Sequence, residues 1–135
     1  GGSCAVGTPA AGVKAVLDAG VPLDHVTMSS DGHGSVPRFN EKGEMVGLGV
    51  GGVACNLKEV KRLVEELGVP MTSALSVVTA NVAKALQLPG KGFVKAGGSA
   101  DLNLFDENLK LVHVFANGRQ MMREGEIIVK GTFEE

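Results

Sequence analysis

The chain has 135 residues, of which 44% are hydrophobic and 21% charged, and its formal net charge is −2. This length fits one ordinary domain, and the apolar content excludes a disordered chain. The small net charge and the lack of any Lys/Arg run longer than two argue against nucleic-acid binding, and no apolar stretch reaches the roughly 20 residues that cross a membrane.

The first predicted helix starts at Thr8 and Pro9 and ends before Gly20. A hydroxyl N-cap followed by proline is a typical helix start, and glycine is the usual residue just past a helix end. Apolar residues within the helix recur at i, i+3 and i+4, which predicts one buried stripe. After a short link, the residues from His25 to Ser29 predict an apolar strand.

A polar, glycine-rich heptapeptide, Ser29 to Ser35, follows this strand. It places one carboxylate, Asp31, at the strand's carboxyl end, where ligand chemistry usually lies in α/β barrels. One interpretation is a turn aspartate that accepts hydrogen bonds from nearby backbone amides, as in most Asp-Gly pairs. The other is a metal ligand or general base. The local pattern leaves both open.

The neighbouring polar residues give weaker signals. Ser35 lies beyond two glycines and is either a turn serine or a ligand contact. His33 is interpreted as a solvent-facing loop residue, His25 lies at the far end of the strand, and His113 is interpreted as an exposed strand residue. The three histidines have no H-x-H or H-E-x-x-H spacing, so they predict no metal site.

Residues 38–46 contain a polar turn at 40–43 and predict a small hairpin. Asn56 is then predicted to cap an amphipathic helix with one buried and one solvated face. The buried stripe comprises Leu57, Val60, Leu63, Val64 and Leu67, and the solvated residues are Lys58, Glu59, Lys61, Arg62, Glu65 and Glu66.

Two short helices and a β unit complete the predicted elements. Thr72 is predicted to cap a helix through Val78, and Asn81 a helix through Leu86. Beyond a boundary near residue 90, four short strands follow one another, with turns between them. The strands are expected at 101–105, 110–116, 119–122 and 126–129, with turns at 108, 117–118 and 124–125.

The run from Val26 to Ser35, with Pro37 and the hairpin after it, resembles the last barrel strand and loop of the isoaspartyl dipeptidase (β-aspartyl peptidase) family of the amidohydrolase superfamily. Residues 90–92 and 97–106 resemble the passage by which many amidohydrolases leave their barrel for a β-sandwich. Residues 129–134 resemble the C-terminus of the isoaspartyl dipeptidases. The resemblance covers nearly the whole chain.

The resemblance implies an α/β fold class: the C-terminal part of a metal-dependent (β/α)8 TIM-barrel amidohydrolase plus part of its small β-sandwich domain. Residues 1–89 would be the last barrel strand and helices, and residues 90–135 the C-terminal strands of the sandwich. The implied activity is the hydrolysis of β-aspartyl dipeptides by a zinc metallopeptidase. A homo-oligomer is expected for the full-length enzyme.

The resemblance also implies site residues. The family holds two zinc ions with an H-x-H pair, a carboxylated lysine, two further histidines and one aspartate. That aspartate matches Asp31, which would bind zinc and act as the catalytic acid and base; the serine that contacts substrate matches Ser35. The family commonly has asparagine where this chain has His33, so no role is implied there. Because the other ligands would lie upstream, the isolated chain is expected to be inactive.

Two alternatives remain at the level of sequence. One is another amidohydrolase, dihydropyrimidinase-like or deacetylase-like; the Ser-Asp-Gly loop and the Thr-Phe-Glu tail favour the dipeptidase instead. The other is a non-catalytic module that associates through its β edges. Cys4 and Cys55 have no CxxC spacing. Two isolated thiols in a chain of this size are typical of a reducing compartment, so we expect a cytoplasmic protein.

Overall fold

A computed structural model describes residues 7–131 and divides the chain into two compact units, Gly1–Leu86 and Gln87–Glu135. Cys4 and the tail motif at residues 132–134 lie outside the described residues, so the expectations placed on them stay predictions. In the described part, no helix is long and apolar enough to cross a membrane.

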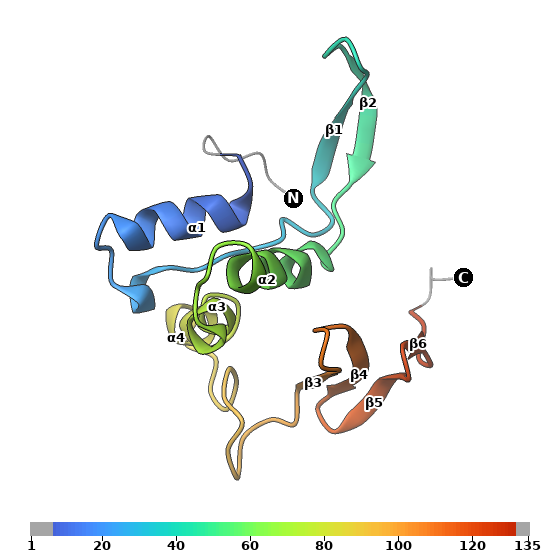
Figure 1. Cartoon of the computed structure of the whole chain (residues 1–135). Coiled ribbons are helices and arrows are strands. Elements are labelled where there is room, and N and C mark those ends of the chain that lie inside the picture. The colour runs from blue at the N-terminus through green and yellow to red at the C-terminus, as the bar shows by residue number, and fades with distance from the viewer. Residues whose placement is uncertain (1–6, 132–135) are drawn as a thin grey trace. The chain divides into compact units, whose positions relative to one another are not determined.

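The first unit combines helices with one β-hairpin (Figure 1). Its elements in chain order are α1 (Pro9–Asp18), the 3-10 turn η1 (Leu23–His25), β1 (Ser35–Phe39), β2 (Met45–Val50), α2 (Cys55–Glu65), α3 (Met71–Ser76) and α4 (Ala80–Ala85). The predicted first helix is confirmed. The Thr8 hydroxyl accepts a hydrogen bond from the Ala11 amide, Pro9 is the first helical residue, and Gly20 has a left-handed φ of 85°.

The predicted strand from His25 to Ser29 is wrong as a paired strand. His25 ends the turn η1, and the residues that follow are extended at Val26 but form no strand ladder. Val26 and Met28 are buried while Thr27 is exposed, so the period-2 pattern that predicted the strand is present. A strand needs a neighbouring strand for its hydrogen bonds, and in the described residues this segment has none.

The predicted hairpin is confirmed and is longer than expected. β1 and β2 pair antiparallel, with Ser35 opposite Val50. At the tip, the Asn40 side chain accepts hydrogen bonds from the amides of Lys42 and Glu44 at 3.0 and 2.9 Å, which is how asparagine stabilises a turn. Figure 1 shows the hairpin extending away from α1 and α2.

Helix α2 differs from expectation at two residues. It begins at Cys55, so Asn56 lies inside its first turn and makes no capping bond; the N-cap is Ala54. Glu59, expected on the solvated face, is 8% exposed. Its carboxylate accepts hydrogen bonds from the Ala10 amide at 2.9 Å and from the Arg62 guanidinium at 2.8 Å. Buried polar groups of this kind are normally hydrogen-bonded, and both partners here come from the fold.

The core of the first unit lies between α1, α2 and α3. Four of the five residues of the predicted stripe face it: Val60 and Leu63 are buried and Val64 and Leu67 pack against the cluster, whereas Leu57 is not among its residues. Leu63 and Val77 are the largest fully buried side chains. The whole buried cluster comprises Ala10, Val13, Val26, Met28, Val60, Leu63, Val69, Ala74 and Val77. The segment before Asp31 is therefore anchored to the core by Val26 and Met28.

The short helices are where the sequence predicts them, but their capping residues differ. The N-cap of α3 is Pro70, so Thr72 lies within the helix. The N-cap of α4 is Thr79, and Asn81 lies in its first turn with 7% exposure. The side-chain amide of Asn81 faces the core, where it donates to the backbone carbonyls of Leu23 and Val26. These partners are distant in sequence, so the position of Asn81 in the helix does not predict them.

The second unit is a four-stranded antiparallel sheet with strand order β3-β4-β5-β6 (Figure 1). Its strands are β3 (Leu102–Phe105), β4 (Leu111–Ala116), β5 (Arg119–Arg123) and β6 (Glu126–Ile127). The predicted turns are confirmed: φ is positive at Asn117 and Gly118, and at Glu124 and Gly125. These pairs of left-handed residues are typical of two-residue hairpin turns.

Candidate active site

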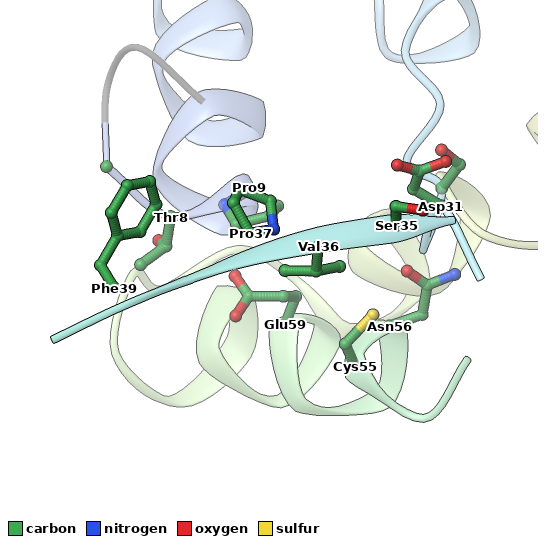
Figure 2. A pocket seen from close by; sticks show the side chains of 12 residues that line it. Thr8, Pro9, Asp31, Ser35, Val36, Pro37, Phe39, Cys55, Asn56 and Glu59 are labelled. Atoms are coloured by element: carbon green, nitrogen blue, oxygen red, sulfur yellow. The ribbon is translucent and has the colours of Figure 1, made fainter. Parts of the chain in front are cut away.

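A pocket in the first unit brings the two predicted site residues together (Figure 2). Asp31 and Ser35 both line this cavity of about 580 Å³. The other lining residues come from the start of α1, from the segment before Asp31, from β1 and from the first turns of α2: Gly7, Thr8, Pro9, Ser29, Val36, Pro37, Phe39, Cys55, Asn56 and Glu59. In Figure 2, Asp31 and Ser35 lie at one end of β1 and Phe39 at the other.

Asp31 begins a tight turn. Its carbonyl accepts a hydrogen bond from the Gly34 amide at 3.0 Å, and the amide of His33 donates to the Gly51 carbonyl at 2.9 Å. Asp31 and His33 have φ values of 48° and 66°, in the left-handed region. Among residues with a side chain, Asn, Asp and His tolerate this region best. His33 therefore has a local conformational role, and asparagine would suit the same conformation.

Two glycines pack against Asp31. A Cβ atom on Gly34 would lie 2.9 Å from the Asp31 Oδ1, and one on Gly51 would lie 2.9 Å from the Asp31 carbonyl oxygen. The second contact is with backbone, so a side chain at Gly51 would displace the turn. Glycine is required at these positions to bring β2 close to Asp31, which holds the exposed carboxylate at the pocket.

Ser35 is the first residue of β1, and it is exposed. It pairs with Val50 across the hairpin, and paired residues of an antiparallel ladder lie on the same face. The turn that begins at Asp31 and the pairing with Val50 therefore hold Ser35 close to Asp31 in space. The cavity lined by both residues is the part of the sequence-based site that the structure brings together.

Glu59 is a pocket residue that the sequence analysis missed. Its carboxylate joins α2 to the first turn of α1 through the Ala10 amide, across 49 residues of sequence. A carboxylate also interacts favourably with the N-terminal end of a helix dipole. Glu59 thereby fixes the wall formed by Thr8 and Pro9. Helical periodicity gave no signal for it, because the partner lies on another helix.

Asn81 was missed in the same way. Its side-chain Nδ2 donates hydrogen bonds to the Leu23 carbonyl at 2.7 Å and to the Val26 carbonyl at 2.8 Å. The Met28 amide donates to the Val77 carbonyl at 2.8 Å. These three bonds attach the segment that precedes Asp31 to α3 and α4. They do for this segment part of what a neighbouring strand would do.

Neither of the remaining histidines is among the residues that line the pocket. His25 is exposed, with its Nε2 3.9 Å from Asp24. His113 is half-buried rather than exposed as expected, since its Nδ1 lies 3.3 Å from both the Gln120 amide nitrogen and the Glu124 backbone nitrogen. Cys55 lines the pocket as a free thiol, 3.2 Å from the Gly52 carbonyl oxygen.

The described residues do not by themselves fit a metal centre. Between residues 7 and 131, no group of three or more His, Cys, Asp or Glu side chains is placed to hold a metal ion. Zinc in proteins usually has four ligands, at least three of them from the protein. Asp31 can supply a carboxylate oxygen to a metal, but the described residues around it do not complete a ligand set.

The chain belongs to the amidohydrolase family: the model described as "Amidohydrolase family" matches residues 5–128. Members of this hydrolase family are typically metal-dependent. The mixture of helices and sheets described above is an α/β fold of this family.

Within the family, the chain is similar to β-aspartyl dipeptidases, as its sequence motifs imply. The enzyme from Fervidobacterium islandicum AW-1, solved in complex with the dipeptide β-Asp-Leu, is 33% identical with a TM-score of 0.77. The match covers 93% of this chain and 33% of that one. A second structure of β-aspartyl dipeptidase from the same organism is 27% identical, with a TM-score of 0.73 and coverage of 93% and 30%.

A third similar structure, N-acetylglucosamine-6-phosphate deacetylase from Pasteurella multocida, shows the fold alone. It is 19% identical with a TM-score of 0.64, and the match covers 87% of this chain and 35% of that one. The chain thus spans about a third of the length of the solved structures that it matches.

Proposed function

We propose that this chain is the C-terminal portion of a zinc-dependent isoaspartyl dipeptidase that hydrolyses the bond between a β-aspartyl residue and the residue that follows it. The observation that carries the proposal is the shared pocket of Asp31 and Ser35, in the loop whose residues match the family motif. The similarity to a β-aspartyl dipeptidase solved with β-Asp-Leu supports this substrate class over other amidohydrolase substrates.

We assign Asp31 two roles in this enzyme: one ligand of the metal centre, and the group that takes a proton from the attacking water and returns it to the leaving amine. A carboxylate can act as both general base and general acid when it lies within hydrogen-bond reach of the reacting atoms. The exposed position of Asp31 at the pocket is compatible with this role. The remaining metal ligands would come from outside residues 7–131.

Ser35 is assigned to substrate binding. Its hydroxyl can donate or accept a hydrogen bond, and its place at the start of β1 puts it in the same pocket as Asp31. Residues 1–89 would then belong to a (β/α)8 barrel and residues 90–135 to a β-sandwich. A homo-oligomer and a cytoplasmic location belong to the same proposal.

The test is an activity assay of the protein expressed from its complete natural reading frame. We expect hydrolysis of β-Asp-Leu but not of α-Asp-Leu, with loss of activity after chelation and recovery on addition of zinc. An enzyme that removes the acetyl group of N-acetylglucosamine 6-phosphate and leaves β-Asp-Leu intact would overturn the proposal in favour of a deacetylase.

A further inference from the structure

One polar side chain of the pocket is not used by the fold. Asn56 lies in the first turn of α2, lines the pocket and is half-buried. Its backbone amide donates to the Val53 carbonyl at 3.4 Å, but within residues 7–131 its side-chain amide has no hydrogen-bond partner. A carboxamide can donate two hydrogen bonds and accept two. All of this capacity is available to a molecule in the pocket.

The other polar side chains of the pocket that have no assigned role differ from Asn56. Thr8 and Glu59 each accept a hydrogen bond from an amide in the first turn of α1, and the Cys55 thiol lies 3.2 Å from a backbone carbonyl oxygen. Ser29 is exposed, so water can supply its hydrogen bonds. A half-buried amide that is left unpaired costs free energy, which a ligand that bonds to it would recover.

Asn56 lies at the end of the pocket that carries the proposed catalytic group. In Figure 2 it lies beneath the end of β1 where Asp31 and Ser35 are found, whereas Glu59 and Phe39 lie further along the strand. Residues three apart share a helix face, which is why both Asn56 and Glu59 reach the pocket from α2. A substrate held by Asp31 and Ser35 would therefore occupy the part of the pocket that Asn56 lines.

The surroundings of Asn56 indicate which substrate group it binds. A β-aspartyl dipeptide carries one ammonium and two carboxylates. The lining formed by the described residues includes no Lys, Arg or His, so a carboxylate must find neutral donors there, and Asn56 has two N–H bonds to offer. The partial positive charge at the start of a helix favours a negative group beside Asn56 and disfavours an ammonium.

We infer that Asn56 is a substrate-binding residue whose side-chain nitrogen donates a hydrogen bond to a carboxylate of the dipeptide. The inference rests on the proposed function. The carboxylate is either the free α-carboxylate of the β-aspartyl residue or the C-terminal carboxylate of the residue that follows it, and both have the same chemistry. This contact is common to the ground state and the transition state, so it acts mainly on KM.

The decisive experiment compares two substitutions in the protein expressed from its complete reading frame. Asn56→Leu removes the donor, and Asn56→Asp replaces it with a negative charge on a side chain of the same shape. An acidic residue in the first turn stabilises a helix, so Asn56→Asp should fold at least as well as the unmodified protein, which a thermal melt checks. The control, Ala54→Asp, places the same charge at the N-cap of α2, an exposed residue that is not among the pocket lining.

We expect Asn56→Leu to raise KM for β-Asp-Leu about ten- to hundredfold, the usual contribution of a hydrogen bond to a charged group. Asn56→Asp should raise KM further, because two negative groups repel each other. The Ala54→Asp control should stay within about twofold, as expected for a surface substitution. In both Asn56 variants kcat should change less than KM.

Two analogues of β-Asp-Leu identify the carboxylate. One has a C-terminal carboxamide and the other an α-carboxamide on the β-aspartyl residue, and each is used as a substrate or as a competitive inhibitor. The additional penalty of Asn56→Asp over Asn56→Leu should vanish with the analogue that lacks the carboxylate bound by Asn56 and persist with the other, because a pairwise interaction is lost when either partner is removed.

Four results would overturn the inference while leaving the proposed function standing. They are an unchanged KM in Asn56→Leu, a lowered KM in Asn56→Asp, an equal effect of Ala54→Asp and Asn56→Asp, and a penalty that persists with both analogues. An unmodified protein that cleaves no β-aspartyl dipeptide would instead overturn the proposed function, and the inference with it.

Discussion

The segment that carries Asp31 and the sheet of the second unit are held in place by different kinds of contact. Residues 26–31 have no strand partner among the described residues and depend on Asn81 and Val77, across sequence separations of 55 residues and about 50. Each strand of the second unit pairs with the next strand along the chain. The first region is therefore defined by distant residues, and the second by local turns.

This difference bears on why the candidate site lies in the first region. A segment freed from ladder pairing can end in a tight turn that presents a carboxylate, as at Asp31. In the second unit, the backbone groups of each strand are hydrogen-bonded to neighbouring strands. The face on which each side chain lies is therefore decided by the strand register. The following predictions test this comparison, from the largest expected effect to the smallest.

Asp31→Asn in the complete protein should lower kcat for β-Asp-Leu by about 10²- to 10⁴-fold, the usual contribution of an acid–base group. An amide cannot take up the proton and is a poorer metal ligand. The matched control is His33→Asn in the same turn, because asparagine also tolerates the φ of 66° at this position. Near-normal kcat for Asp31→Asn would show that Asp31 is only a turn residue.

Asn81→Ala should lower the free energy of unfolding by about 2–4 kcal/mol, because the buried Val26 carbonyl and the partly buried Leu23 carbonyl each lose a hydrogen-bond donor. Chemical denaturation followed by circular dichroism measures it. The control is Asn103→Ala, an exposed position in β3, where a change within about 0.5 kcal/mol is expected. Similar effects at both sites would remove the distinction between distant and local contacts.

Gly118→Ala should destabilise the second unit by about 1–2 kcal/mol, because alanine disfavours the φ of 80° at the β4–β5 turn. Gly43→Ala, with a φ of 78° at the tip of the β1–β2 hairpin, should cost a similar amount. Thermal melts of both variants measure these costs. Equal values would show that the turns of the two units are governed by the same local conformational preference; a large difference would contradict it.

Ser35→Ala should raise KM for β-Asp-Leu more than it lowers kcat. The loss of one neutral hydrogen bond corresponds to about 0.5–1.5 kcal/mol, or roughly a two- to tenfold change. An interaction common to the ground state and the transition state acts on KM. Steady-state kinetics with the complete protein provide the test, and a pure kcat defect would mean that Ser35 takes part in bond making.

The smallest expected effect is a loss of folding stability in acid, and it should be alike in the two units. Hydrogen bonding to the Lys84 ammonium lowers the pKa of Asp24 below its usual 3.8, and hydrogen bonding to Lys91 lowers the pKa of Asp101. Because the pKa values are lower in the folded protein, the stabilisation is present above the unfolded pKa and is lost as pH falls through the folded value. Asp24→Asn and Asp101→Asn should each reduce stability slightly at pH 7. Both differences should shrink as the pH falls below the unfolded value of 3.8; a difference that grew in acid would contradict the assignment.

The elements that the sequence predicts well are those encoded by neighbouring residues. Thr8 with Pro9, the polar turn at 40–43, and the turns at Asn117-Gly118 and Glu124-Gly125 all mark boundaries that the structure has. In each case the signal is a backbone preference of the residue itself, such as a hydroxyl cap or a left-handed φ. Such preferences need no knowledge of the rest of the fold.

The residues that the sequence predicts poorly are those whose partners are distant. Asn56 and Asn81 look alike as helix caps, yet Asn81 is buried and bonded to Leu23 and Val26. Helical periodicity places Glu59 on the solvated face of α2. In the structure its carboxylate is buried and accepts a hydrogen bond from the Ala10 amide. The presence of Asp31 and Ser35 in one pocket could be predicted because only three residues lie between them in the sequence. The pairing of Val50 with Ser35 and of Leu48 with Pro37 could be known only from the ladder register.

The close packing of Gly34 and Gly51 against Asp31 has a consequence for how this loop can change over generations. Mutations at these glycines would displace the aspartate itself, so they are expected to be removed by selection whatever the substrate. His33 is exposed and is limited by its φ of 66° to residues such as Asn and Asp, whereas Val50 is exposed in a regular strand. New substrate preferences should therefore arise by substitution at these exposed positions, with the glycines as a fixed frame, and a saturation library of the loop should recover diversity in that pattern.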